Sequence, residues 1–169
     1  MSLLTRLLAR GTVVLANSAS KLQSLQMRLT AGELNDDIEH FEPYGFTSRP
    51  LAGAEGVVTF LGGDRSHAIA LVIADRRYRL QSLTNGEVAI YTDEGDKIHF
   101  KRGRIIDIET STLNIRASTA VNFDTPVLNQ TGKIVSTGDQ IAGAVSQLNH
   151  AHVGVQPGSG QTGAPVGGK

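Results

Sequence analysis

The strongest constraint on the fold is an alternation of apolar and polar residues over positions 112–127. The odd positions are mostly apolar and the even positions mostly polar, which is the period of a β-strand with one buried face. At about 3.3 Å per residue, a continuous strand of this length would measure on the order of 50 Å, too long to fold back into a small barrel. The apolar odd positions include Leu113, Ile115, Ala117, Val121, Phe123 and Val127. Such a ribbon needs a partner outside its own chain.

The region around this ribbon is poor in charge. From residue 111 to the end, the chain carries only Arg116, Asp124, Lys133, Asp139 and Lys169 as charged residues. Monomeric domains normally cover their surface with charged side chains. Three ribbons around a threefold axis can turn their apolar faces inward as a triangular prism. We therefore expect an obligate homotrimer.

The preceding part of the chain predicts short antiparallel strands. Leu25, Met27 and Leu29 alternate with polar residues, and turn sequences such as Asn85-Gly86 separate further candidates about every ten residues. The expected strands cover residues 23–29, 56–61, 68–73, 87–91, 97–100 and 105–109. This rhythm indicates an all-β chain whose residues 20–110 form an OB-like antiparallel barrel. Before it we expect a basic N-terminal arm over residues 1–19, with a first strand after Gly11.

The chain becomes rich in glycine beyond this ribbon. We expect residues 111–148 to form a triple-stranded spike, with short strands rather than a helix near residues 141–148, because Gly138 and Gly143 weaken a helix there. Residues 149–169 form the expected apex, which contains two histidines and a tail of Gly and Pro. Such a tail would be disordered if it were left alone.

His150 and His152 form the only close histidine pair in the sequence. Residues i and i+2 of an extended chain project to the same side, so both imidazoles can face one point. Three chains on an axis would supply six nitrogens, enough for octahedral coordination of a first-row transition metal such as iron or nickel. An isolated pair of this kind is more often solvated and metal-free. Because the preceding ribbon predicts a trimer, we expect this pair to bind a metal.

Catalytic motifs are scarce in this sequence. The chain has no Cys, and it contains no GxSxG, HExxH or Walker sequence. One alternative is a metal-dependent hydrolase that uses the histidine pair with a carboxylate such as Asp139. A closed site of six imidazoles would leave no open coordination position, so we expect no enzymatic activity.

A second alternative is an OB-fold binding module for single-stranded nucleic acid or a glycan. Arg76, Arg77 and Arg79 surround Tyr78, and stacking on an aromatic residue flanked by cations is one way OB folds hold single strands. Asp75 and a formal net charge of +0 weaken the attraction to phosphate. We expect an exposed turn at this place, and no nucleic-acid partner.

Four stretches together are similar to the baseplate central spike proteins of contractile-tailed phages, of the Mu-like baseplate assembly protein V type. They are residues 44–55 (YGFTSRPLAGAE), 61–65 (LGGDR), 86–95 (GEVAIYTDEG) and 150–163 (HAHVGVQPGSGQTG). The resemblance implies an N-terminal OB-like domain followed by a trimeric intertwined β-helix that tapers to a tip. It also implies one iron ion per trimer, held by His150 and His152 of each chain.

The resemblance further implies a structural role at the centre of the tail baseplate. The spike would be driven through the host outer membrane when the tail sheath contracts. Its implied partners are two further copies of the chain, the hub proteins of the baseplate and, through mechanical contact, the host outer membrane. The protein would be made in the host cytoplasm, assembled into the virion tail and delivered into the host cell envelope.

Overall fold

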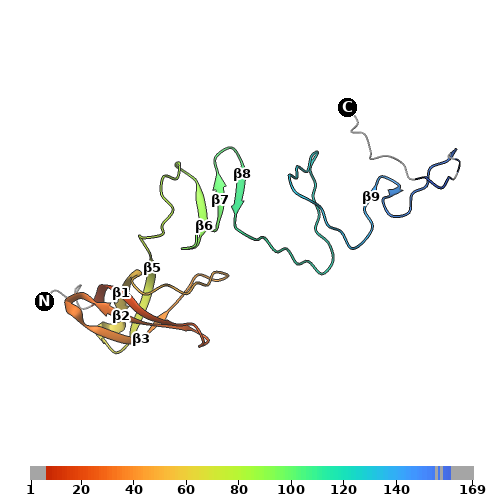
Figure 1. Cartoon of the computed structure of the whole chain (residues 1–169). Coiled ribbons are helices and arrows are strands. Elements are labelled where there is room, and N and C mark those ends of the chain that lie inside the picture. The colour runs from red at the N-terminus through yellow and green to blue at the C-terminus, as the bar shows by residue number, and fades with distance from the viewer. Residues whose placement is uncertain (1–6, 155, 157, 161–169) are drawn as a thin grey trace. The chain divides into compact units, whose positions relative to one another are not determined.

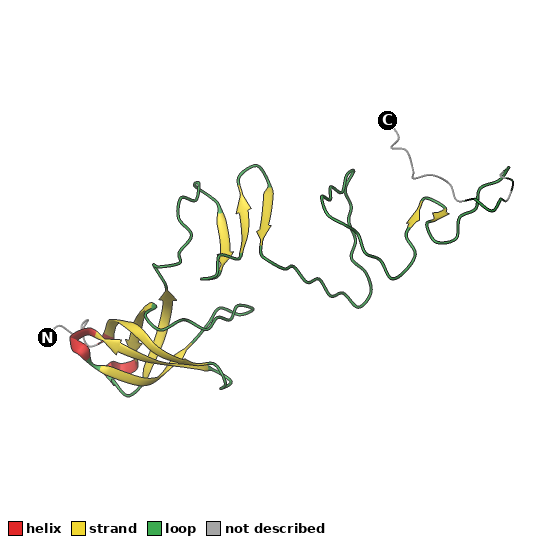
Figure 2. Cartoon of the chain, in the orientation of Figure 1, coloured by secondary structure: helices red, strands yellow, loops and turns green. Residues whose placement is uncertain are grey.

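The computed structural model describes residues 7–154, 156 and 158–160. The chain divides into two compact units, Met1–Arg116 and Ala117–Lys169. Strands and two short 3-10 turns make up the elements of the described part (Figure 2). Among these residues, no helix is both long enough and apolar enough to cross a bilayer. The expected all-β class is therefore confirmed.

The N-terminal half of the first unit is a closed five-stranded barrel (Figure 1). Its strands are β1 (Leu8–Asn17), β2 (Gln23–Leu29), β3 (Leu34–His40), β4 (Glu55–Phe60) and β5 (Ala68–Ala74). The order around the barrel is β1-β2-β3-β5-β4, and β4 pairs with β1 to complete the ring. All pairs are antiparallel except β3 with β5. Two 3-10 turns, η1 (Thr30–Gly32) and η2 (Leu61–Gly63), lie between the strands.

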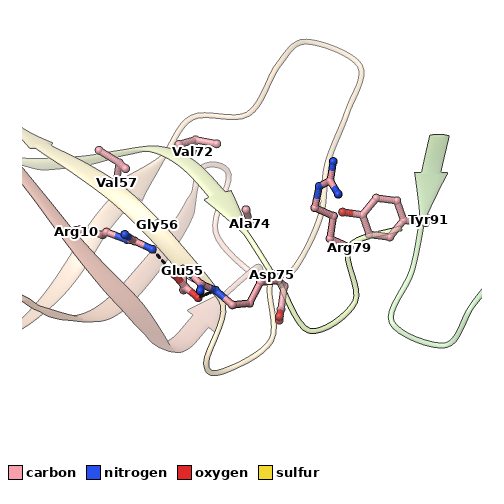
Figure 3. Close-up of a pocket in the computed structure, with 10 residues that line it drawn as sticks. Arg10, Glu55, Gly56, Val57, Val72, Ala74, Asp75, Arg79 and Tyr91 are labelled. Atoms are coloured by element: carbon pink, nitrogen blue, oxygen red, sulfur yellow. Dashed lines mark hydrogen bonds and ion pairs between the residues drawn. The ribbon is translucent and has the colours of Figure 1, made fainter. Parts of the chain in front are cut away.

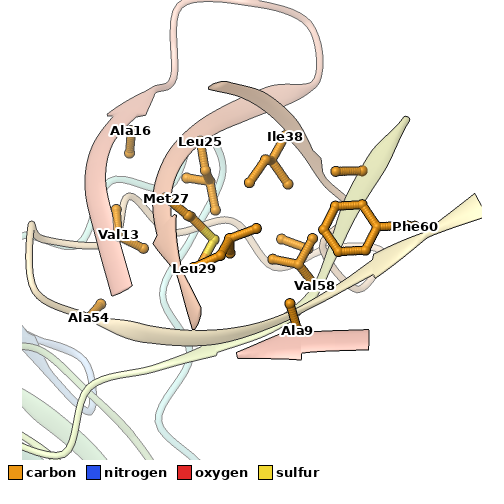
Figure 4. Packing of buried hydrophobic residues seen from close by; sticks show 12 residues of the cluster. Ala9, Val13, Ala16, Leu25, Met27, Leu29, Ile38, Ala54, Val58 and Phe60 are labelled. Carbon is orange, nitrogen blue, oxygen red and sulfur yellow. The ribbon is translucent and has the colours of Figure 1, made fainter. Parts of the chain in front are cut away.

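The barrel interior is filled mainly by small and aliphatic side chains (Figure 4). Phe60 is its only aromatic residue, and the guanidinium of Arg65 lies 4.3 Å from the centre of that ring. The alternation that predicted β2 is confirmed, because its odd positions all point inward. The core consists of Ala9, Val13, Ala16, Leu25, Met27, Leu29, Ile38, Ala54, Val58, Phe60, Ala68 and Ala70.

Two glycines face each other where β1 meets β4. Gly11 is the pairing partner of Gly56 in this ladder. A Cβ atom on Gly11 would lie 2.5 Å from the carbonyl oxygen of Arg28, and one on Gly56 would lie 2.4 Å from the Cδ1 atom of Ile73. The first contact is with the backbone of β2, which cannot move away easily, so position 11 requires glycine, whereas the second is with the end of a flexible side chain on β5.

The boundaries of the barrel differ from the predicted ones. A first strand was expected after Gly11, within an N-terminal arm over residues 1–19. Strand β1 instead begins at Leu8, and it belongs to the barrel. A β-bulge between Val13 and Leu15 interrupts the alternation, so the inward residues of this strand do not follow a simple period of two. Residues 1–6 lie outside the described part.

The barrel also ends earlier than residue 110. Strand β5 pairs with both β3 and β4, so after Ala74 the ring has no free edge to accept later strands. The prediction missed β3, because Asp36, Asp37 and Glu39 gave that segment the composition of a solvated acidic face. Ile38 and His40 nevertheless point inward and are buried.

The predicted strands after the barrel form a separate antiparallel sheet. It consists of β6 (Val88–Tyr91), β7 (Lys97–Lys101) and β8 (Ile105–Glu109), in that order. The Glu87 carboxylate holds the two turns at one end of this sheet. Its Oε2 accepts the Thr84 amide at 3.0 Å, and its Oε1 accepts the Arg102 amide at 3.1 Å.

The second unit contains one small hairpin among its described residues. Strands β9 (Ile141–Ala142) and β10 (Val145–Ser146) confirm short strands rather than a helix in this segment. No strand is assigned to residues 112–127, and the apolar odd positions of the predicted ribbon are exposed in the single chain. The ribbon therefore has no partner within the part of its own chain that the structure describes.

Candidate functional site

The two histidines predicted as metal ligands lie together in the structure. The ring centres of His150 and His152 are 5.2 Å apart, and the ring planes meet at 83°. His150 Nδ1 lies 2.9 Å from the backbone carbonyl oxygen of Ser146. A carbonyl can only accept, so Nδ1 carries the proton and Nε2 keeps its lone pair free. Histidines that bind metals commonly have this arrangement.

The β9–β10 hairpin positions the first of these histidines. The amide of Gln147 donates to the carbonyl of Gln140 at 3.0 Å, and the amide of Leu148 donates to Asp139 Oδ1 at 3.1 Å. The next amide, that of Asn149, donates to the Ser146 hydroxyl at 2.8 Å. This turn of consecutive hydrogen bonds leads the chain directly into His150.

Asp139 stabilises the β9–β10 hairpin by accepting a hydrogen bond from the Leu148 amide. Hydrogen bonds, chiefly from the Ser146 side chain and the Leu148 amide, hold the pKa of Asp139 below its ordinary range. Among residues 7–154, 156 and 158–160, no group of three or more His, Asp or Glu side chains could hold a metal ion. In the predicted shared site, His150 and His152 of one chain would supply two of the six imidazole nitrogens. Of the predicted tail, residues 155, 157 and 161–169 lie outside the described part.

The arginine cluster of the predicted binding module lies beside an open pocket of about 410 Å³ (Figure 3). Glu55 Oε2 lies 2.6 Å from Nη2 of Arg10 and 2.6 Å from Nη2 of Arg76. Hydrogen bonds from Arg76 and then Arg10 hold the pKa of Glu55 below its ordinary range. Two cations thus share one carboxylate, which reduces the charge they can offer to a phosphate.

The remaining arginines also have partners in the chain. Arg77 makes a two-pronged ion pair with Asp75, with distances of 2.5 Å for Nη2 to Oδ2 and 2.9 Å for Nε to Oδ1. Its Nη2 also donates to the Ala52 carbonyl at 2.9 Å, and its guanidinium lies 5.3 Å from the centre of the Tyr78 ring. Arg79 Nη1 donates to the neighbouring Leu80 carbonyl at 3.3 Å. The cluster is an exposed turn braced by local contacts.

The usual OB-fold binding surface, on β2 and β3, has more acidic than basic residues here, because Arg28 is the one Arg or Lys on these two strands. OB folds bind oligonucleotides on the face of their second and third strands. In this chain β3 carries Asp36, Asp37 and Glu39, of which the first two are exposed. These carboxylates repel phosphate, so this surface also disfavours a nucleic-acid ligand.

An exposed aromatic loop was not predicted as a site. Residues 41–54 join β3 to β4, and they contain three of the eight aromatic residues of the chain, Phe41, Tyr44 and Phe46. All three are exposed, and Tyr44 is fully exposed at the tip of its turn. Clusters of exposed aromatic residues are typical of protein interfaces. The sequence could have indicated this loop as a candidate interface, because three aromatic residues lie within six positions around Pro43.

The loop is held in place by hydrogen bonds. Glu42 Oε1 accepts the Ser48 amide at 2.6 Å, and its Oε2 accepts the Thr47 hydroxyl at 3.0 Å. Burial acts to raise the pKa of Glu42, but these hydrogen bonds outweigh it and the pKa lies below its ordinary range. Gln23 Nε2 on β2 donates to the Ser48 carbonyl at 2.6 Å. The aromatic side chains are therefore displayed on an ordered loop.

Comparison with known proteins places this chain among phage proteins. Residues 10–77 match the family described as Bacteriophage Mu Gp45, N-terminal. The chain is 36% identical over 158 residues to the Mu-like prophage FluMu protein gp45 of Haemophilus influenzae, with 86% of each chain covered. The chain belongs to the Mu gp45 family.

A second member of the Mu gp45 family is the baseplate puncturing device gp45 of Escherichia phage Mu. It is 39% identical over 129 residues, which is 76% of this chain and 65% of the phage Mu protein. The chain thus spans just under two thirds of that relative. The residues matched by the family description coincide closely with the barrel, which runs from Leu8 to Ala74. The predicted resemblance to Mu-like baseplate spike proteins is confirmed.

Proposed function

We propose that this protein is the central spike of a contractile phage tail baseplate. The observation that carries the proposal is the 39% identity to a protein named a baseplate puncturing device. In this role the spike is driven through the host outer membrane when the tail sheath contracts. It is made in the host cytoplasm, carried in the virion tail and delivered into the host envelope.

The proposed spike is a homotrimer with an OB-like barrel at one end and an intertwined β-helix at the other. The exposed apolar row from Leu113 to Val127 supports this arrangement, because it lacks an intrachain partner within the described residues. Three such rows can bury one another around a threefold axis. Interwound strands also dissociate slowly, because separating them requires unfolding.

The proposed tip holds one iron ion between three chains. His150 and His152 of each chain would supply six imidazole nitrogens, and the free Nε2 of His150 supports this assignment. Such an ion, when bound, ties the three chain ends where little apolar surface remains to be buried. Metal binding then adds to the folding free energy of the tip. The role is mechanical and non-enzymatic.

A baseplate component must bind other baseplate proteins, and the loop of residues 41–54 is the surface we assign to the hub proteins. Its exposed Phe41, Tyr44 and Phe46 are of the residue types that anchor interfaces. The hydrogen bonds to Glu42 hold the loop in one conformation, which lowers the entropy lost on binding.

Electron microscopy of phage tails tests the proposed role. Tails assembled with the protein carrying a small C-terminal density label should show the label on the baseplate axis, in three copies. Purified full-length protein should sediment as three chains. A label on the sheath or the tail fibres, or a stable folded monomer at micromolar concentration, would contradict the proposal.

A further inference from the structure

The turn that precedes β6 contains the one Asn-Gly pair of the chain, Asn85-Gly86. The amide of Glu87 donates to the Thr84 carbonyl at 3.0 Å, which closes a β-turn with Asn85 and Gly86 at its centre. Gly86 has a φ of 85°, whereas Asn85 is not among the residues with positive φ, so the turn is of type II. A type II turn favours glycine at this place, so the asparagine is followed by a residue without a side chain.

Both central residues of this turn are open to solvent. Asn85 and Gly86 are exposed. Neither the Asn85 side chain nor the Gly86 amide makes a hydrogen bond to a residue that the structure describes. Exposed turns with few contacts open locally at little cost in free energy. The Asn85 side chain can therefore rotate toward the backbone nitrogen that follows it.

An Asn-Gly pair with an unbonded amide can modify itself. The Gly86 nitrogen attacks Cγ of Asn85 to form a succinimide ring, while the Cγ–Nδ2 bond breaks and Nδ2 leaves as ammonia with the proton of the Gly86 amide. Solvent water then opens the ring at either carbonyl carbon, which gives aspartate or isoaspartate. Glycine favours ring closure, because no Cβ hinders its nitrogen and its backbone rotates freely.

Arg102 lies where its charge favours loss of the Gly86 amide proton, which the attack requires. Nη1 of Arg102 lies 2.8 Å from the position that a Cβ atom on Gly86 would take. A Cβ lies about 2.5 Å from the nitrogen of its own residue, so the guanidinium is within roughly 5.5 Å of the Gly86 nitrogen. An opposite charge at about 4–6 Å stabilises an ionised group. Among the described residues, the Arg102 guanidinium has no ion-pair partner that would compete.

The neighbouring Glu87 carboxylate acts against this effect, but other groups already engage it. Its Oε1 accepts the Arg102 amide at 3.1 Å, and its Oε2 accepts the Thr84 amide at 3.0 Å and lies 3.2 Å from His99 Nε2. Hydrogen bonds from the Arg102 and Thr84 amides hold the pKa of Glu87 below its ordinary range. These donors disperse the negative charge, so the guanidinium is the stronger influence on the exposed Gly86 nitrogen.

We infer that Asn85 is a site of spontaneous deamidation and that Arg102 increases its rate. The product carries a new carboxylate near Arg102, and isoaspartate lengthens the backbone of the turn by one carbon atom. The longer backbone no longer matches the hydrogen bond from the Glu87 amide to the Thr84 carbonyl, so the modification loosens the turn that leads into β6. This inference does not depend on the proposed spike function.

Ageing of the full-length protein tests the site. After incubation in mildly alkaline buffer enriched in heavy-oxygen water, digestion and mass spectrometry should find aspartate and isoaspartate at position 85, with heavy oxygen incorporated. Asn17 and Asn149 are internal controls, because both are exposed but are followed by Ser18 and His150, which carry side chains. We expect Asn85 to convert at least tenfold faster than either control.

A matched pair of arginine variants tests the contribution of Arg102. Arg102→Gln should slow the conversion of Asn85 about threefold, because a cation at an exposed site shifts a pKa by less than a full unit. Arg104→Gln removes an arginine two residues away whose atoms do not approach Gly86, and it should convert at the wild-type rate. In concentrated urea the wild-type protein and both variants should convert equally, because folding brings Arg102 to the turn.

The outcomes separate the two parts of this inference. If Asn85 converts no faster than Asn17, the site itself is wrong. If Asn85 converts quickly but equally in folded Arg102→Gln and Arg104→Gln, the site stands and the contribution of Arg102 is wrong. A threefold slowing by Arg102→Gln that persists in urea would also overturn the contribution of Arg102 through the folded turn.

Discussion

His150 Nδ1 donates a hydrogen bond to the Ser146 carbonyl oxygen, and this contact leaves the Nε2 atom of the same ring available to a metal. We expect purified protein to contain one transition-metal ion, most simply iron, for every three chains. Elemental analysis combined with sedimentation measures this ratio. One ion per chain would indicate independent sites and rule out a shared axis.

Removal of both imidazoles tests whether trimer formation depends on the metal at the tip. We expect the double variant His150→Ala with His152→Ala to lose the metal and to remain trimeric, because apolar burial along the prism does not depend on the ion. His67→Ala is the control, since His67 is an exposed histidine in the first unit. Dissociation of the double variant into monomers would show that the ion itself holds the chains together.

A charge on the apolar row should prevent assembly. Phe123→Asp would place a carboxylate in the dry axis of the prism, at a cost of several kcal/mol per chain. Asn122→Asp introduces the same side chain on the polar side of the ribbon and should leave the trimer intact. Sedimentation of refolded protein compares the two, and equal trimer content would argue against an apolar axis at this position.

The aromatic loop should be required for incorporation into the baseplate. Tyr44→Ala with Phe46→Ala should lower the amount of protein in purified tails at least tenfold, because exposed aromatic residues dominate interface affinity. Its thermal unfolding should not change, since both side chains are exposed. Glu42→Gln, which weakens the hydrogen bonds that hold the loop, should give a smaller loss. Normal incorporation of the double variant would show that another surface binds the hub.

Lowering the pH should lower the free energy of unfolding of the barrel, because His40 is buried in it. Burial lowers the pKa of His40 below its ordinary value of 6.5, and the nearby Glu42 carboxylate opposes this only in part. The unfolded chain therefore takes up this proton at a higher pH than the folded chain. The free energy of unfolding should be constant above pH 6.5 with respect to this group, and it should fall as the pH drops from 6.5 through the lower folded value.

Replacement of the buried histidine tests that pH dependence. His40 is 6% exposed, and its Nδ1 has no hydrogen-bond partner in the described structure. Unfolding of His40→Gln, followed from pH 7 to pH 5, should show a weaker decline in stability than the wild-type protein, with His67→Gln as the control. An unchanged decline in His40→Gln would assign the effect to other groups.

Position 11 should not tolerate a side chain without loss of stability. A Cβ on Gly11 would meet the Arg28 carbonyl oxygen at 2.5 Å, and a backbone atom within a ladder cannot move away easily. We expect Gly11→Ala to lower the free energy of unfolding by about 1–3 kcal/mol. Thr12→Ala, at the exposed neighbouring position, should change it by less than about 0.5 kcal/mol. Thermal unfolding compares the two.

Several elements of this protein follow directly from local sequence patterns. The alternation of Leu25, Met27 and Leu29 predicts β2, because the period of two reflects only the pleat of the strand. The strands of the second sheet and the short strands near residue 141 follow from the same pattern and from turn residues. The spacing of His150 and His152 likewise brings their rings together without help from distant residues.

Membership of the barrel depended on contacts between residues far apart in the sequence. In strand β1, a bulge interrupts the alternation of buried and exposed residues, and the amide of Val13 there donates to the Ala54 carbonyl. In strand β3, exposed carboxylates obscure the apolar positions of the pattern. The barrel ends at Ala74 because β5 pairs with β3 as well as β4 and thereby closes the ring. Local periodicity shows which side of a strand is apolar, but ring closure and hydrogen-bonded pairing decide which strands share a core.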